Sequence, residues 1–137
     1  MQILKIDFQS QSAPPVIPVM QSDAQSRFIG MALYNGGTPY KAPEGAAYTV
    51  QYRGEGANNF GWYDQILTTS GKHAAVTVDA DNAHIITLEL AEQALRRPGD
   101  VHVNLCVMGP DTGYELRTFD IIVRVGGAAY PDDVAVQ

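Results

Sequence analysis

The sequence is poor in cysteine, in charged residues and in long apolar runs. Cys106 is the single cysteine among 137 residues, so no disulfide can form within the chain and packing alone must hold the core. We expect Cys106 to be a small, semi-buried hydrophobic residue and not a nucleophile. Charged residues make up 18% and hydrophobic residues 45%, with 13 glycines and 8 prolines. This balance favours one ordered, loop-rich globular domain.

Positive charge is also scarce. Nine lysines and arginines stand against fifteen acidic residues, which gives a formal net charge of -6. The basic residues are spread singly from Lys5 to Arg124, except at Arg96-Arg97. Without a basic stripe to release counterions, neither nucleic-acid binding nor an anionic membrane surface is expected.

The opening segment lacks the features of a targeting sequence. Lys5 and Asp7 interrupt its apolar residues almost at once. The sequence therefore predicts neither a signal peptide nor a membrane span, and it predicts synthesis in the cytoplasm.

Metal-ligand and catalytic patterns are missing as well. His73, His84 and His102 each stand alone, without a second histidine or a cysteine at ligand spacing. The run 79–82 (DADN) begins like a calcium loop, but His84 and Leu90 occupy the positions that need glycine and glutamate, so a hairpin turn is expected. No serine lies in a G-x-S-x-G turn. We expect no metal, no cofactor and no enzymatic activity.

Alternation between two faces is the main positive signal. Tyr48, Val50 and Tyr52 fall on one face of a strand, and the residues between them fall on the other. Similar patterns predict a set of short strands at 2–8, 16–20, 27–35, 48–53, 74–78, 84–90, 101–108 and 119–125. Their expected inward residues include Val76 and Val78; Ile86, Leu88 and Leu90; Val101, Val103, Leu105 and Val107; and Phe119, Ile121, Val123 and Val125.

These strands predict an all-β fold, a two-layer antiparallel β-sandwich with Greek-key or jelly-roll-like connections. One short helix is expected over 90–95, where good helix formers precede Pro98-Gly99. The run 54–61 (GEGANNFG) is expected to be a flexible loop, and no helix follows it that could bind a phosphate. Residues 1–125 would form the sandwich, and 126–137 a tail or linker.

Several of these pieces, taken in order, resemble the N-terminal domain of the baseplate upper protein family of phage and prophage tails. They are the turn 35–40 (NGGTPY), the strand 48–53 with its Gly-rich loop, the run 97–100 (RPGD) before a long strand, and the closing hairpin 113–121. The resemblance covers residues 3 to 125. It implies a structural domain that docks on tail-hub proteins and supports receptor-binding parts.

The resemblance also implies a location and an assembly. The protein would be a virion component of the tail baseplate, made in the bacterial host cytoplasm. Its partners would be the hub and receptor-binding proteins, and a homo-oligomer, with a trimer favoured, would be expected. The family continues beyond the sandwich into a trimerising segment, whereas this sequence stops at Gln137.

A second hypothesis is a carbohydrate-binding β-sandwich module. Trp62 and Tyr63, with Tyr40 and Tyr114 in turns, are candidates for an aromatic platform. Aromatic residues near loops are equally typical of protein interfaces. For either function the candidate interaction surface comprises Asn59, Phe60, Trp62, Tyr63, Tyr40, Pro15 and Tyr130.

Overall fold

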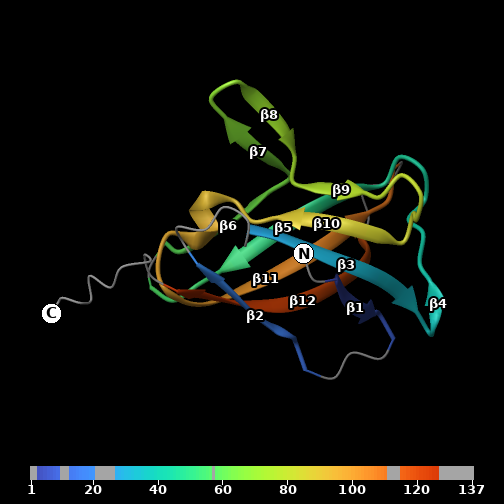
Figure 1. Ribbon diagram of the computed structural model, residues 1–137, viewed down its shortest axis with the longest axis horizontal. Helices are drawn as coiled ribbons and strands as arrows, with labels where there is room; N and C mark the ends of the chain where they lie inside the picture. The colour runs from blue at the N-terminus through green and yellow to red at the C-terminus, as the bar shows by residue number, and fades with distance from the viewer. Residues whose placement is uncertain (1–2, 10–12, 21–26, 57, 111–114, 127–137) are drawn as a thin grey trace, which may run out of the picture.

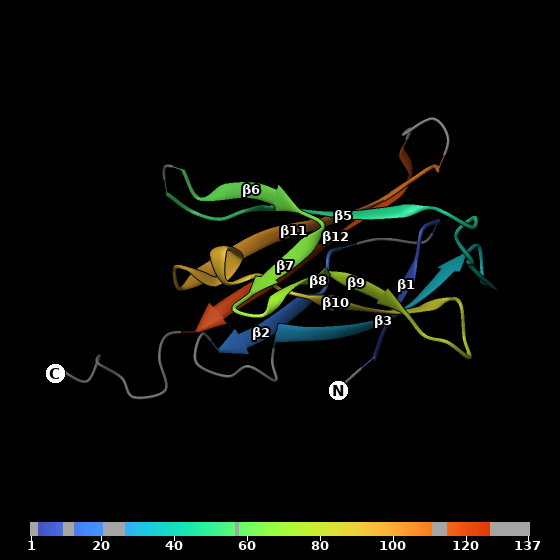
Figure 2. The same ribbon diagram turned by 90° about the horizontal axis from the view of Figure 1, so that it is seen from above.

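Two β-sheets pack face to face and enclose a single hydrophobic core (Figures 1 and 2). The computed structural model describes residues 3–9, 13–20, 27–56, 58–110 and 115–126, with side chains from 119 in the last range. The predicted all-β sandwich is confirmed. In Figure 2 the layer with β5, β6 and β11 lies above the layer with β3, β9 and β10.

The first sheet has the order β1-β3-β10-β9, with β4 paired to β3, and the second has the order β2-β12-β11-β5-β6. A separate two-stranded sheet contains β7 and β8. The strand bounds are β1 Ile3–Asp7, β2 Val16–Met20, β3 Phe28–Asn35, β4 Thr38–Pro39, β5 Ala47–Arg53, β6 Phe60–Tyr63, β7 Gln65–Thr68, β8 Gly71–Ala74, β9 Val76–Val78, β10 Ile85–Glu89, β11 Gly99–Met108 and β12 Glu115–Gly126.

Among the described strands two pairs are parallel, whereas the sequence predicted an antiparallel sandwich. Strand β1 pairs with β3 in parallel, and β2 pairs with β12 in parallel. Strands β1 and β2 lie at the edges of their sheets, and the other pairs among the described strands are antiparallel. Strands β1 and β2, although consecutive in the sequence, therefore belong to different layers.

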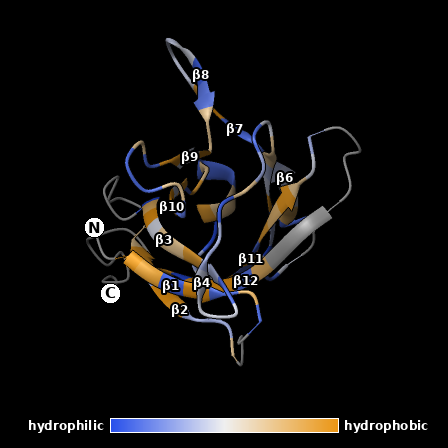
Figure 3. Cartoon of the chain, turned by 90° about the vertical axis from the view of Figure 1, so that its right-hand side faces the viewer, coloured by the Kyte–Doolittle hydropathy of each residue, from blue (hydrophilic) through white to orange (hydrophobic). Residues whose placement is uncertain are grey.

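Most of the residues that were predicted to face inward are buried in the core. Alternate residues of β10, β11, β12 and β5 are buried, and Ile86, Leu88 and Val50 are fully inaccessible. Figure 3 shows hydrophobic segments of β3, β10, β11 and β12 running through the middle of the molecule. Val78 is the exception, since it is 46% exposed although its neighbour Val76 is buried. Strand β9 lies at the edge of its sheet and ends at Val78.

The predicted short helix is present as a single 3-10 turn, η2, at Glu92–Leu95. Ala94 and Leu95 are buried and anchor it to the core. Among the described residues, no helix is long and apolar enough to cross a membrane.

Strands β7 and β8 form a hairpin that projects away from the two layers (Figure 1). Most of its residues are exposed, and Leu67 is 80% exposed. A hydrogen bond connects it to the body, because His73 Nε2 lies 2.6 Å from Glu89 Oε1 of β10.

A carboxylate at the end of β1 holds the Gly-Gly turn between β3 and β4. Asp7 Oδ1 accepts hydrogen bonds from the backbone N–H groups of Gln9 and Gly36, and Oδ2 accepts one from Gly37. Both glycines have positive φ, 66° and 84°, as this tight turn requires. These backbone hydrogen bonds, with a smaller contribution from Lys5, lower the pKa of Asp7.

Replacement of Asp7 by asparagine is expected to destabilise the domain. The amide keeps the shape of the side chain but loses the charge-assisted hydrogen bonds to the turn. Because the folded pKa lies below the unfolded value, the contribution of Asp7 is present above about pH 4 and is lost as pH falls through the folded pKa. Urea unfolding of both proteins between about pH 2 and pH 7 checks this, and a difference that stays constant with pH would contradict it.

Candidate functional site

The hairpin of β5 and β6 places two aromatic rings on the outer face of the second sheet. Residues 60 and 61 were expected to belong to a flexible loop, and that prediction is wrong: β6 begins at Phe60 and pairs antiparallel with β5. In a strand, residues two apart point to the same face. Phe60 and Trp62 accordingly both face outward and are 61% and 64% exposed.

Polar side chains continue the same face across β5 and β11. Arg53 lies opposite Phe60, and Gln51 lies opposite Trp62. On the other side of β5, His102 lies opposite Arg53 and Asn104 opposite Gln51. Directly opposite residues have Cβ atoms about 5 Å apart, so these side chains form a grid of two rows and three strands. We call this grid, with its six side chains, the β6 platform.

An open hollow of about 430 Å³ lies on the β6 platform. Its lining consists of the six platform residues together with Tyr52 and Gly61. Gly61 is needed there because a Cβ would lie 2.7 Å from the Tyr52 hydroxyl oxygen. The volume falls within the range of about 300–1,000 Å³ that is typical of small-ligand sites.

Among the residues that the structure describes, no carboxylate lines the hollow. The guanidinium of Arg53 lies 6.0 Å from the ring centre of Phe60, a cation–π distance. Asn104 Nδ2 donates to Asp120 Oδ1 at 2.6 Å. Asp100 accepts two hydrogen bonds from Arg124, which lower the pKa of that carboxyl. The neighbouring carboxylates are therefore already engaged by protein groups.

Asn104 is held in one orientation by further contacts. Its Nδ2 also donates to the carbonyl of Phe119, and its Oδ1 accepts from the thiol of Cys106. Cys106 is 6% exposed, so it is more deeply buried than the semi-buried position expected. The inner border of the platform is thus preorganised by β12 and β11.

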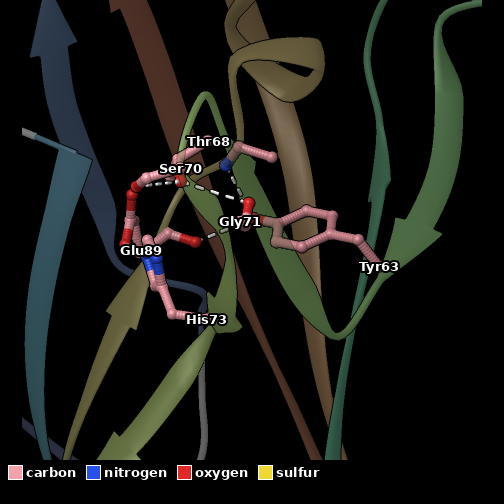
Figure 4. A network of polar contacts seen from close by, with 7 residues as sticks. Tyr63, Thr68, Ser70, Gly71, His73 and Glu89 are labelled. Atoms are coloured by element: carbon pink, nitrogen blue, oxygen red, sulfur yellow. Dashed lines mark hydrogen bonds and ion pairs between the residues drawn. The ribbon is translucent and has the colours of Figure 1, made fainter.

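Tyr63 is not part of any exposed platform, and that prediction is wrong. It points inward from β6 and is 6% exposed. Its hydroxyl donates to the carbonyl of Glu89 and accepts from the N–H of Ala91, both at 3.0 Å, which ties β6 to the segment after β10 (Figure 4). Burial raises the pKa of Tyr63 to about 12, although the hydrogen bond from Ala91 acts in the opposite direction.

The structure separates the other candidate surface residues. Asn59 was expected at the surface, but it is 5% exposed and its Nδ2 donates to the carbonyl of Glu55 inside the β5–β6 loop. Tyr40 is half-buried against Phe8, with ring centres 5.1 Å apart. Pro15 lies beside the other edge of the second sheet, where its carbonyl accepts from the N–H of Ile122. Tyr114 and Tyr130 lie outside the described residues.

Two further hollows flank the 3-10 turn. One, of about 500 Å³, is lined by Arg27, Glu92, Gln93, Leu95 and Arg96. The other, of about 410 Å³, lies between this turn and β6–β7. Arg27 borders both, and its Nε is buried without a hydrogen-bond partner within the described ranges. These hollows mix charges of both signs and have no aromatic pair on one face.

Across the described part of the chain, no group of three or more histidine, cysteine, aspartate or glutamate side chains lies close enough to hold an ion. The run 79–82 forms the expected turn, in which Asp79 Oδ2 accepts from the backbone N–H groups of Asp81 and Asn82.

The fold has counterparts among solved structures. It matches the N-terminal domain of phage TP901-1 ORF48 with a TM-score of 0.59 and 14% identity, over 90% of this chain and 95% of that domain. The cysteine protease inhibitor EhICP2 from Entamoeba histolytica gives a TM-score of 0.45 at 16% identity over the same shares. No family model matches the sequence, and no curated protein matches it. The chain therefore shares a fold with a phage protein domain.

Proposed function

We propose that this protein is a structural, non-enzymatic domain of a phage or prophage tail baseplate. The observation that carries the proposal is the match to the phage TP901-1 domain along nearly the whole of both chains. The order of sequence pieces from the turn 35–40 to the closing hairpin 113–121 resembles the baseplate upper proteins. The sequence resemblance thus supports the baseplate class, and the fold match supports a relation to a phage protein.

In this role the domain docks on tail-hub proteins and supports receptor-binding parts. Exposed apolar side chains at an edge of the second sheet suit such docking, since Val16 and Met20 of β2 are 46% and 41% exposed. Pro18 lies between them and limits further strand addition at this edge, so contacts would be made by side chains. We further propose a homo-oligomer, with a trimer expected from the resemblance.

Mass spectrometry of density-purified particles tests the proposal. After prophage induction of the source strain, peptides of this chain are expected at an abundance comparable with other minor tail proteins. Abundant host cytoplasmic proteins in the same fractions serve as the carry-over control. Absence of the chain from well-formed tailed particles, or abundance equal to carry-over, would overturn the baseplate role.

A further inference from the structure

We propose that the β6 platform is a carbohydrate-binding site that holds a pyranose ring of a glycan against Trp62 and Phe60. The starting observation is that the two most exposed aromatic rings described come from alternate positions of one edge strand. A soluble domain exposes such a pair on one face at a cost in hydration free energy, so a ligand is a physical reason for it.

The polar side chains of the β6 platform, on β5 and β11, suit the hydroxyl groups of a sugar. A sugar presents a flat face of C–H groups and a rim of hydroxyls, and each hydroxyl both donates and accepts hydrogen bonds. The rings of Phe60 and Trp62 match the flat face. Arg53 and Gln51 lie opposite them on β5, and His102 lies one strand further along, opposite Arg53, so these planar side chains can meet the rim. An apolar protein segment would leave these three polar groups without partners.

The rigidity and the charge of the β6 platform also favour carbohydrate binding. The cation–π contact holds Arg53 beside Phe60, and the contacts to Asp120 and Phe119 hold Asn104 at the inner border. A preformed site loses little conformational entropy on binding. Because no carboxylate lines the hollow, neutral sugars and sugars that carry an acidic group both fit without repulsion. The proposal does not depend on the baseplate role, since it follows from the grid alone.

Binding at the β6 platform can be followed by tryptophan fluorescence, because Trp62 is the only tryptophan of the sequence. A ring stacked on this exposed indole removes water from it and changes its fluorescence. Cellohexaose, chitohexaose, maltohexaose and an alginate hexamer, each at about 10 mM, sample neutral, N-acetylated and acidic pyranoses well above the dissociation constants of weak sites near 1 mM. At least one of them is expected to shift the emission of Trp62 saturably.

Variants then locate the binding, which is followed by ligand-observed NMR. Trp62→Ala is expected to weaken it at least 10-fold, and Gln51→Ala severalfold, because each removes one half of the sugar contact. Ile3→Ala is the matched control: Ile3 is a 50% exposed apolar residue on β1 of the other sheet, and its truncation is expected to leave binding unchanged. Unfolding curves of all variants verify that the fold is intact.

Three results would overturn the proposal. One is the absence of any saturable change with all four oligosaccharides. Another is binding that Ile3→Ala weakens as much as Trp62→Ala does, since that would be nonspecific adsorption to exposed apolar groups. Binding that survives Gln51→Ala unchanged but requires Trp62 would likewise count against a sugar and for a purely apolar ligand.

Discussion

Replacement of Leu88 by alanine is expected to lower the free energy of unfolding by about 2–5 kcal/mol. Leu88 lies in the middle of β10, opposite Ile29 of β3 and Val76 of β9, and is completely inaccessible to solvent. The substitution removes buried methyl groups and leaves a cavity between the layers, because neighbouring side chains relax only in part. Urea unfolding measures the loss, and a fall in Tm on the order of 10 °C should accompany it.

Leu67→Ala is the matched control, because the same atoms are removed from a side chain that is 80% exposed. The free energy of unfolding is expected to change by less than about 0.5 kcal/mol. A loss as large as that of Leu88→Ala would show that the β7–β8 hairpin is folded against the body in solution, and would contradict the projecting arrangement in Figure 1.

Replacement of Tyr63 by phenylalanine is the second large expected effect, a loss of about 1–3 kcal/mol at neutral pH. The ring still fills its place in the core, but the N–H of Ala91 and the carbonyl of Glu89 lose their partner in a buried position. Urea unfolding at pH 7 checks the value. Phe119→Leu, which changes a buried ring without touching a hydrogen bond, controls for altered aromatic packing.

The loss of unfolding free energy caused by Tyr63→Phe should also depend on pH. Burial raises the folded pKa of Tyr63 to about 12, above the unfolded value of 10. Between these values the unfolded phenol loses its proton while the folded one keeps it, so the contribution to stability is full below pH 10 and declines as pH rises to 12. The decline amounts to at most about 3 kcal/mol. The difference between wild type and Tyr63→Phe should therefore narrow above pH 10, and a constant difference would contradict the buried hydroxyl.

Alternation of side chains was sufficient to predict most strands and their inward faces. Val101 to Val107 and Phe119 to Val125 have a strict period of two, and the structure buries the predicted members. The pattern says which face is buried, but it carries no information about which strand lies alongside. For this reason the parallel pairs of β1 and β2 were not predicted, although both segments were recognised as strands.

The candidate site was predicted only in part, because glycine and asparagine dominate the segment 54–61. Those residues indicate a loop, and Phe60 was assigned to it. The adjacent aromatics Trp62 and Tyr63 contained the missing signal, since neighbours in a strand must face opposite sides and only one of them can be exposed. Burial of Asn59 depends on a hydrogen bond within the loop, and no periodicity encodes such a contact.

The parallel pairing of β2 with β12 has a consequence for the order in which the chain folds. Val16 pairs with Ile122, and strands β3 to β11 lie between them in the sequence, so β2 has no ladder to join until β12 has been synthesised. Pairing between distant segments requires a large loop to close first, which slows folding. The pairing of β2 with β12 is therefore a late step in the folding of this sheet. Until β12 is made, Pro18 lowers the risk that β2 pairs with a strand of another nascent chain.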